Sequence, residues 1–270
     1  MEDYLDKISR EIRLDILKMY YIAGWGHLSS ALSCVDIIVN ICFCRIFNIH
    51  EIGNDHLVLS KGHGCATLYA VYARMGLLNR DELKTFYQNG SRLVGLLNPE
   101  VMEIGIPAGS LGHGICFSTG VAMADKLDSN GKYTIVLLGD GEEQEGSVWE
   151  AIQFAAIKKL SNLIVVVDCN GLQASEYVNE LGSVRHREKW EAFGWNVIDV
   201  DGHNHCELTN SFTSSKNNDK PSVILAQTIK GKGIPYIENK SDWHSRVPQG
   251  AEWDEVCVEL GINQHDLEYL

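Results

Sequence analysis

Short runs of near-continuous Val, Ile and Leu alternate with amphipathic stretches along most of the chain. The apolar runs, which predict buried strands, are residues 55–60, 133–140, 162–170, 196–202 and 222–229. Apolar positions at helical spacing predict helices over residues 1–20, 32–47, 64–76, 112–127, 146–160 and 187–195. Strands that are apolar throughout and separated by helices favour a mostly parallel sheet with helices on both faces, so the predicted fold class is α/β.

No internal repeat or low-complexity tract interrupts this pattern, and we expect residues 1–270 to form a single domain. The stretch GWGHLSS, residues 24–30, is predicted to be a loop. The most linker-like piece is TSSKNNDKP, residues 213–221, which is short enough to be a surface loop between a helix and a strand.

Composition narrows the classes of function. The chain is 45% hydrophobic and 22% charged, which is ordinary for a globular protein, and its formal net charge is −13. That charge, without a stripe of Lys and Arg interleaved with aromatic residues, argues against nucleic acid as a partner. No apolar run reaches the roughly 18 residues of a membrane span, and the charged N-terminal stretch is unlike a signal peptide. We therefore expect a soluble, cytoplasmic protein that does not bind membranes.

The eight cysteines are scattered, and no CxxC pair occurs among them. Neither a zinc ribbon nor a disulfide framework is indicated in a chain of this length. We expect the cysteines to be reduced and mostly part of the core.

Polar residues follow two successive predicted strands at the point where each strand ends. Asp140 follows the run at 133–138, and Asp168 and Asn170 follow the next run. Ligands of parallel sheets bind at the carboxyl ends of the strands, and Mg²⁺ prefers oxygen ligands. Asp140 and Asn170 could supply two such ligands, and a backbone carbonyl near Leu172 a third.

The stretch LLGDGEEQEG, residues 137–146, combines these carboxylates with glycines. Glycines on both sides of Asp140 would let a diphosphate approach the backbone, and the helix that begins near Gly146 would favour its negative charge. A plain acidic turn explains the same residues, and spacing alone does not decide between the two. Glu142 and Glu143 are expected to face solvent or to cap the following helix.

The wider pattern resembles a known family. Gly139, Asp140 and Gly141, followed by Asn170, resemble the thiamin diphosphate motif, and the rest of the chain is similar to transketolases, specifically to the N-terminal subunit of split transketolases. The matching segments occur in the family's order from Gly26 to Pro248: GHLSS, LSKGHG, AGSLGHG, GDGEEQEG, DCNGLQ, VDGHN, TIKGKG and DWHSRVP.

This resemblance implies a cofactor, thiamin diphosphate, and a divalent metal, Mg²⁺ or else Ca²⁺ or Mn²⁺. By resemblance, the metal ligands would be Asp140, Asn170 and the carbonyl of Leu172. The residues near the cofactor would be His63 and His244 at the diphosphate, Gly109 and Leu111 along the pocket, and Gly141 and Ile229 close to it.

Two further roles follow from the resemblance. His27 would lie near the reacting carbons, where transketolases use it in substrate binding and proton transfer, and His63 and His244 join it as candidate catalytic residues. Glu145 would belong to the carboxylate network that links paired cofactor sites across a dimer. Because thiamin diphosphate supplies the carbanion chemistry, the protein has to anchor it and move protons, and histidines suit proton transfer near neutral pH.

Other histidines and glycines have simpler interpretations. His203 and His205 could suggest a zinc pair, but no further ligands lie at zinc-site spacing, so a loop is favoured. His113 is expected to support its loop. The segment IKGKG lacks the spacing of a P-loop and does not indicate an ATPase.

The sequence departs from the family pattern in two ways. Transketolases usually carry Gly-His-Pro, whose histidine contacts the donor's hydroxyl end, where this chain reads Leu97, Asn98 and Pro99 with an apparent one-residue insertion. This departure puts the usual ketose phosphate donor in doubt. The family's catalytic glutamate lies in a pyrimidine-binding domain for which 270 residues leave no room, so another polypeptide is expected to complete the site.

The expected function is that of a transketolase N-terminal subunit. Together with a C-terminal subunit carrying the pyrimidine-binding domain, in an α2β2 assembly built on a homodimer, it would move a two-carbon ketol unit from a ketose phosphate to an aldose. One alternative is part of another thiamin diphosphate enzyme, such as a carboligase or the α chain of a 2-oxoacid dehydrogenase, against which DWHSRVP argues. A non-catalytic cofactor-binding subunit is the other, against which His27, His63, Glu145 and His244 argue.

Overall fold

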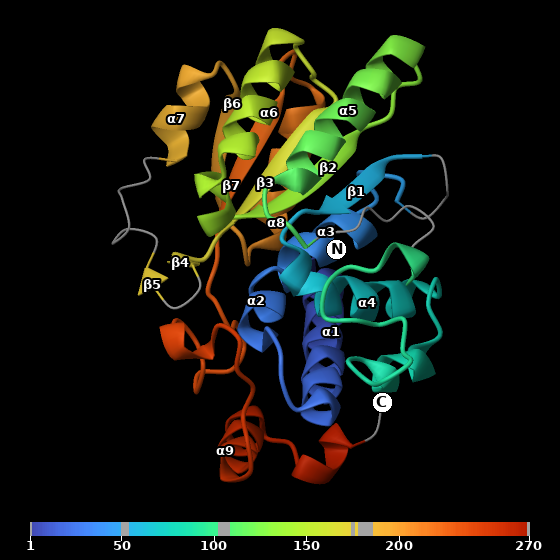
Figure 1. Ribbon diagram of the computed structural model, residues 1–270, viewed down its shortest axis with the longest axis vertical. Coiled ribbons are helices and arrows are strands. Elements are labelled where there is room, and N and C mark those ends of the chain that lie inside the picture. Colours follow the sequence, from blue (N-terminus) through green and yellow to red (C-terminus); the bar gives the residue numbers. More distant parts are fainter. Residues whose placement is uncertain (1, 50–53, 102–108, 174–175, 178–185, 269–270) are drawn as a thin grey trace.

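The computed structural model describes residues 2–49, 54–101, 109–173, 176–177 and 186–268. Its centre is a parallel sheet in the order β1-β2-β3-β7-β6 (Figure 1). The strands are β1 (His56–Leu59), β2 (Thr134–Gly139), β3 (Leu163–Cys169), β6 (Asn196–Asp201) and β7 (Ser222–Gln227). Each lies within a predicted apolar run, and the predicted α/β fold class is confirmed.

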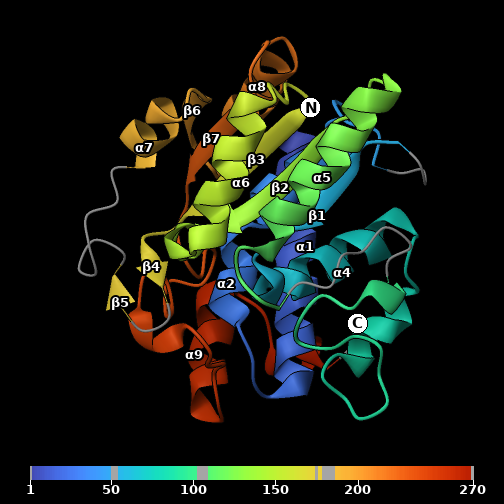
Figure 2. The same cartoon turned by 45° about the horizontal axis from the view of Figure 1, so that its top comes forward.

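Helices cover both faces of the sheet because alternate strand residues point to opposite sides (Figure 2). In β2, Ile135 and Leu137 pack on one side, and Val136 and Leu138 on the other. The first side is covered by α1 (Glu2–Ala23), α3 (Val35–Phe43), α4 (Cys65–Met75) and α8 (His205–Lys216). The second side is covered by α5 (His113–Asp128), α6 (Gly146–Ile157) and α7 (His186–Ala192).

Smaller elements complete the described part of the chain. These are α2 (Leu28–Ser33), α9 (Ala251–Leu260), the antiparallel pair β4 (Leu172–Gln173) and β5 (Glu176–Tyr177), and the 3₁₀ turns η1 (Gly62–Gly64), η2 (Arg80–Thr85), η3 (Pro99–Val101), η4 (Gly141–Gln144), η6 (Ser241–Trp243) and η7 (Gln264–Leu267).

Two predicted loops are shorter than expected. The loop at 24–30 ends where α2 begins, at Leu28, and the loop at 213–221 begins only after α8 ends, at Lys216. In α8, Leu208, Phe212 and Ser215 are buried at helical spacing. Tertiary packing therefore extends this helix into a stretch whose polar composition favours a loop.

The sheet brings three strand ends to one edge. In the register, Gly139 of β2 pairs with Asp168 of β3, and Asp168 pairs with Ala226 of β7. Because the strands are parallel, the residues after each strand leave the sheet side by side. Asp140, Asn170 and Thr228 therefore come together at the carboxyl edge.

All eight cysteines are free, and five of them are buried, which agrees with the expectation that most belong to the core. Cys116 and Cys206 are exposed, and Cys44 is partly buried. Among the described residues, no helix combines the length and the apolar character that crossing a membrane requires.

Candidate functional site

A cavity of about 630 Å³ opens at the carboxyl edge of the sheet. Its walls come from segments that are distant in the sequence. The lining residues are His27, Ser30, Lys61, His63, Leu96, Gly109, Leu111, Gly139, Asp140, Gly141, Glu142, Asn170, Leu172, Gln173, Glu176, Lys230 and His244.

Three histidines form one side of this cavity. His27 immediately precedes α2, His63 lies in η1, and His244 follows η6. The ring centroid of His27 is 5.5 Å from that of His63 and 5.4 Å from that of His244, and the His63 and His244 centroids are 5.9 Å apart. Nδ1 of His27 is buried without a hydrogen-bond partner among the described residues. The cluster therefore contains an imidazole nitrogen that no described residue bonds.

The histidine cluster is neutral in this environment. Burial lowers the pKa of His27 and lowers that of His63 well below its usual value, and Lys61 and Lys230 lower both further. Burial and the charge of Lys230 lower the pKa of His244 to about 3. The three imidazoles therefore act in the free protein as hydrogen-bonding groups and proton acceptors, and the positive charge of the cavity comes from its lysines.

This neutrality predicts a pH dependence of stability. Below about pH 6.5, an unfolded chain protonates His244, whereas the folded chain does so only near pH 3, so the free energy of unfolding falls as the pH drops from 6.5. After allowance for solvent screening, we expect His244→Asn to lose about 1 kcal/mol less stability than the wild type between pH 7 and pH 5. Urea denaturation at both pH values measures this, with His265→Asn at an exposed position as the control. Equal losses in His244→Asn and in the wild type would contradict the assignment.

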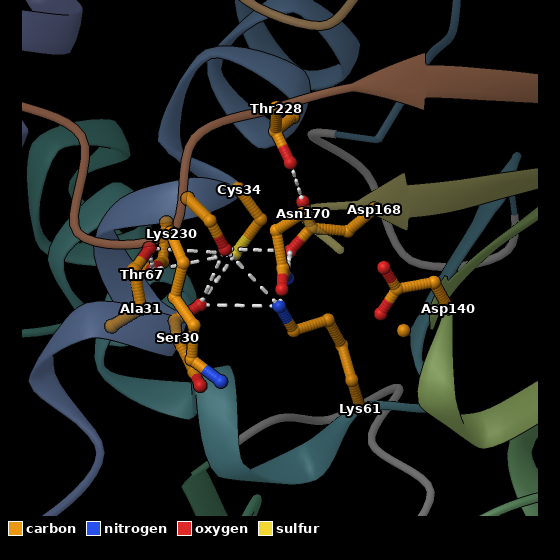
Figure 3. Close-up of polar contacts among 12 residues, drawn as sticks. Ser30, Ala31, Cys34, Lys61, Thr67, Asp140, Asp168, Asn170, Thr228 and Lys230 are labelled. Carbon is orange, nitrogen blue, oxygen red and sulfur yellow. Dashed lines mark hydrogen bonds and ion pairs between the residues drawn. The ribbon is translucent and has the colours of Figure 1, made fainter. Parts of the chain in front are cut away.

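Lys61 and Asp168 form a buried ion pair next to the cavity (Figure 3). The ammonium of Lys61 contacts Asp168 Oδ2 and donates to the carbonyl of Ser30 at 3.1 Å. Asp168 also accepts from Ser33 Oγ at 2.6 Å and from the hydroxyl of Thr228. Because these partners hold the carboxylate, the pKa of Asp168 is lowered although the residue is fully buried. The pair ties the ends of β1, β3 and β7 together.

Asp140 and Asn170 present oxygen atoms at the cavity. Asp140 accepts from the backbone N–H groups of Gly141 at 2.8 Å and Gly171 at 2.6 Å, and Asn170 Oδ1 accepts from the N–H of Leu172 at 3.2 Å. Burial, together with the charge of Asp168, raises the pKa of Asp140 to about 6. A buried carboxylate whose charge is costly is well suited to a cation, and the neighbouring amide and carbonyl oxygens add to its donor set.

Lys230 is a cavity residue that the sequence pattern did not single out. Its side chain is buried, and its Nζ lies 2.7 Å from His244 Nδ1. Burial and the charge of Lys61 lower its pKa to about 8. The segment IKGKG lacks P-loop spacing, but a lysine that follows a buried strand at the same sheet edge as Asp140 is a signal that could have identified it.

Glu142 and Glu143 do not face solvent, and this expectation was wrong. Glu142 accepts from Ser60 Oγ at 2.5 Å, from the N–H of Gly112 at 2.8 Å and from the N–H of Gly139 at 3.2 Å. Glu143 accepts from Trp190 Nε1 at 2.6 Å. Both side chains are buried. Their hydrogen bonds connect η4 to the segments that contain Ser60 and Gly112 and to α7.

The structure brings most of the candidate residues to the cavity. Those that line it are His27, His63, Gly109, Leu111, Asp140, Gly141, Asn170, Leu172 and His244. Two candidates are not among the lining residues. Glu145 is exposed at the start of α6, and Ile229 donates its N–H to His203 Nε2 at 2.9 Å, behind the cavity.

Asn98 does not line the cavity either. Its Nδ2 donates to the carbonyl of Arg92 at 2.9 Å and its Oδ1 accepts from the N–H of Glu100 at 3.1 Å, so the amide serves its own loop. Leu96 lines the cavity instead, beside Gly109. Residues 102–108, which separate these two segments, lie outside the described part of the chain.

His203 and His205 do not form a zinc pair. His203 contacts Asp36 and the N–H of Ile229, whereas His205 contacts Ser9 and Asn40. The described residues contain no group of three or more His, Cys, Asp and Glu side chains placed to hold a metal ion. A metal at Asp140 and Asn170 would consequently need oxygen ligands from the molecule that it accompanies.

A parallel sheet whose carboxyl edge holds a cavity with buried lysines, neutral histidines and a carboxylate defines a cofactor-binding α/β domain. A family model described as "Transketolase, thiamine diphosphate binding domain" matches residues 6–268. The chain belongs to this family, and the resemblance found in its sequence is confirmed.

Relatives of similar length carry the word subunit in their names. The chain is 34% identical over 270 residues to an apulose-4-phosphate transketolase subunit of Phocaeicola vulgatus, covering 98% of this chain and 96% of that protein. It is 36% identical to "6-deoxy-6-sulfo-D-fructose transketolase subunit SqwG" of Clostridium sp. strain MSTE9, covering 88% of this chain and 89% of that protein. The expected class of enzyme, a transketolase-type transferase represented by its N-terminal subunit, agrees with both relatives.

A solved structure shares the fold. The transketolase of Campylobacter jejuni superimposes with a TM-score of 0.87 at 26% sequence identity, covering 96% of this chain. The match covers only 43% of that transketolase. The remainder of that longer protein has no counterpart in these 270 residues.

Proposed function

We propose that this chain is the diphosphate-binding subunit of a two-subunit transketolase. With a partner subunit that carries the pyrimidine-binding domain, it transfers a two-carbon ketol unit from a ketose phosphate to an aldose. The observation that carries this proposal is the convergence on one cavity of the histidine cluster, two buried lysines and the Asp140 and Asn170 oxygens.

The residues present fit thiamin diphosphate with a divalent metal. A diphosphate needs positive charge and hydrogen-bond donors, which Lys230, Lys61 and the neutral imidazoles supply. A divalent metal would be held by the oxygen donors of Asp140, Asn170 and the Leu172 carbonyl. Gly141 lines the cavity beside them and lets the backbone come close. We propose Mg²⁺, with Ca²⁺ or Mn²⁺ as substitutes.

When bound, thiamin diphosphate supplies a carbanion and an electron sink for the transferred unit. The chain's own residues would orient the substrate and move protons. His27, whose Nδ1 is buried without a partner in the described chain, would accept or return a proton at the substrate's hydroxyl groups. Leu96 and Leu111 would exclude water from the mouth of the cavity.

The proposed assembly contains two copies of each subunit. The names of the relatives of similar length support a second subunit, and this chain matches only 43% of the C. jejuni transketolase. Phe117 of α5 and Phe154 of α6 are 49% and 43% exposed on neighbouring helices, and Glu145 is exposed at the start of α6. We propose that this surface pairs two copies of the chain, with Glu145 linking their cofactor sites.

A cytoplasmic location fits this function. All eight cysteines are free, which is typical of proteins kept in a reducing compartment. Sugar phosphates, the proposed substrates, would be met there.

The donor preference should depend on Leu96 rather than on Asn98. Leu96 lines the cavity, so Leu96→His should change the ratio of kcat/KM between two ketose donors by about tenfold, the value of one altered polar contact. Asn98→His should leave that ratio unchanged while costing about 1 kcal/mol of stability through lost loop hydrogen bonds. Steady-state kinetics with xylulose 5-phosphate and a second ketose phosphate measure the ratio. If Asn98→His changed the ratio and Leu96→His did not, donor preference would depend on Asn98 instead.

The proposed function is tested by purifying the chain together with a C-terminal transketolase subunit from the same organism. The pair is assayed for ketol transfer from a panel of ketose phosphates, with a coupled aldehyde-release assay, in the presence of Mg²⁺ and thiamin diphosphate. Transfer that requires both additions is the expected result. A pair that binds the cofactor and transfers no ketol unit from any donor would refute the proposal.

A further inference from the structure

Lys230 lies in a short turn, residues 228–233, that follows β7. Backbone bonds anchor this turn at several points: the N–H of Thr228 donates to Cys169, the N–H of Gly231 to Ser29, and the N–H of Asn239 to the carbonyl of Lys230, at distances of 3.2, 2.9 and 2.9 Å. Side chains reach the backbone of the turn at three further points, the N–H of Ile229, the carbonyl of Lys232 and the N–H of Gly233. The contacts at Ile229 and Lys232 join into one network.

The network begins at His203, which follows β6. Its Nε2 accepts from the N–H of Ile229 at 2.9 Å, and its Nδ1 lies 2.7 Å from Asp36 Oδ2. Asp36, at the start of α3, is held by Arg13 through two contacts of 3.0 and 2.5 Å. Arg13, on α1, then returns to the turn and donates from Nε to the carbonyl of Lys232 at 3.2 Å. The polar contacts thus form a closed ring around the segment that carries Lys230.

The hydrogen-bond directions fix the tautomer of His203. Since the N–H of Ile229 is a donor, Nε2 must be an acceptor without a proton, and Nδ1 must carry the proton that Asp36 accepts. The side chains of His203 and Asp36 are only 11% and 6% exposed, so water does not readily replace either partner. The imidazole therefore transmits the position of α1 and α3 to one particular backbone N–H of the turn.

We propose that His203, oriented by Asp36, is a positioning residue that fixes the 228–233 turn and thereby holds Lys230 at the diphosphate. This role rests on the proposed function. It assigns a task to His203, for which the sequence pattern indicated only a place in a loop. His203 is not among the residues that line the cavity, and its contact with the turn is to the backbone N–H of Ile229.

Two conservative variants separate the two bonds of His203. A glutamine side chain reaches about as far as Nε2 and can accept from Ile229, whereas an asparagine reaches only about as far as Nδ1 and can donate to Asp36. The matched control is His205→Asn. The buried ring of His205 contacts Ser9 and Asn40 and lies 3.7 Å from Asp36, but it makes no contact with the turn, so this variant reports on the loss of a buried imidazole beside Asp36. Hydrogen–deuterium exchange of the full chain, without cofactor, reports on the turn itself.

In the exchange experiment, we expect His203→Asn to speed exchange of the 228–233 segment by about tenfold, the value of one lost hydrogen bond, while His203→Gln and His205→Asn leave it within about twofold of the wild type. Titration of the assembled pair with thiamin diphosphate and Mg²⁺ gives the second readout. There, His203→Asn should weaken binding by about three- to tenfold and His203→Gln should restore it.

The outcomes distinguish this inference from the proposed function. Equal exchange in His203→Asn and the wild type, or faster exchange with unchanged cofactor affinity, would overturn the positioning role. If His205→Asn weakened cofactor binding as much as His203→Asn does, the effect would be a general destabilisation. That result would also overturn the positioning role of His203. A wild-type pair that binds no thiamin diphosphate would contradict the proposed function, while the exchange experiment would still decide whether His203 anchors the turn.

Discussion

Asp140→Ala will remove metal-dependent binding of thiamin diphosphate while the protein stays folded. The substitution deletes the carboxylate that lines the cavity between Gly139 and Gly141. The other lining carboxylates among the described residues are the buried Glu142, which is bonded to Ser60, and the exposed Glu176. Loss of a metal ligand should weaken cofactor binding by about 100-fold or more. The fold should persist because Asp140 contributes to neither apolar core on the faces of the sheet.

Isothermal titration of the assembled pair, with and without Mg²⁺, measures this effect. Asp140→Asn is the informative companion, because it keeps the shape and one acceptor oxygen but removes the charge, and we expect it to bind with intermediate affinity. Asp128→Ala, at an exposed position at the end of α5, is the control for the purification and for general changes of charge. Unchanged affinity in Asp140→Ala, with circular dichroism like that of the wild type, would remove Asp140 from the metal site.

The 270-residue chain alone will show no measurable ketol transfer. The cavity holds groups for a diphosphate and a metal, whereas the carboxylate that activates the cofactor's ring is expected from the pyrimidine-binding subunit. A missing general acid or base costs about 10²–10⁴-fold in rate. Without the partner subunit, the site would also lose the contacts that this subunit makes to the ring of the cofactor. The partner should therefore raise the rate by at least about a thousandfold when it is added.

A coupled aldehyde-release assay, with and without the partner, gives the rate, and light scattering gives the mass of each sample. The isolated chain should be a homodimer, because pairing would bury the exposed aromatic side chains of α5 and α6. The mixture with the partner should contain two copies of each subunit. Glu145→Ala should disturb that pairing more than Glu259→Ala, the matched change on α9. Ketol transfer by the purified chain alone would show that the partner subunit is not needed to complete the active site.

The sequence predicted the sheet and one wall of the cavity because both depend on local pattern. Runs such as residues 163–167 are apolar at every position. This pattern is typical of a strand that is covered on both faces, because its alternate side chains point into two apolar layers. From parallel strands it follows that Asp140 and Asn170 emerge side by side, and the structure places both at the cavity.

Other parts of the site depend on packing that no local pattern reveals. Glu142 and Glu143 look like solvent-facing residues until Ser60, Gly112 and Trp190 are placed around them. A charged side chain is buried when donors from distant segments meet it, and spacing along one segment cannot show that. Lys230 was missed for the same reason, since its burial beside His244 exists only in three dimensions.

The order in which the chain is synthesised limits when the cofactor can bind. Ser29 donates to the carbonyl of Trp243, 214 positions later, beside His27 and His244. During translation at about 5–20 residues per second, the strands β1, β2 and β3 are therefore complete well before the cavity closes. All five strands of the sheet end at or before Gln227, so the whole sheet is synthesised before His244, the last residue that lines the cavity.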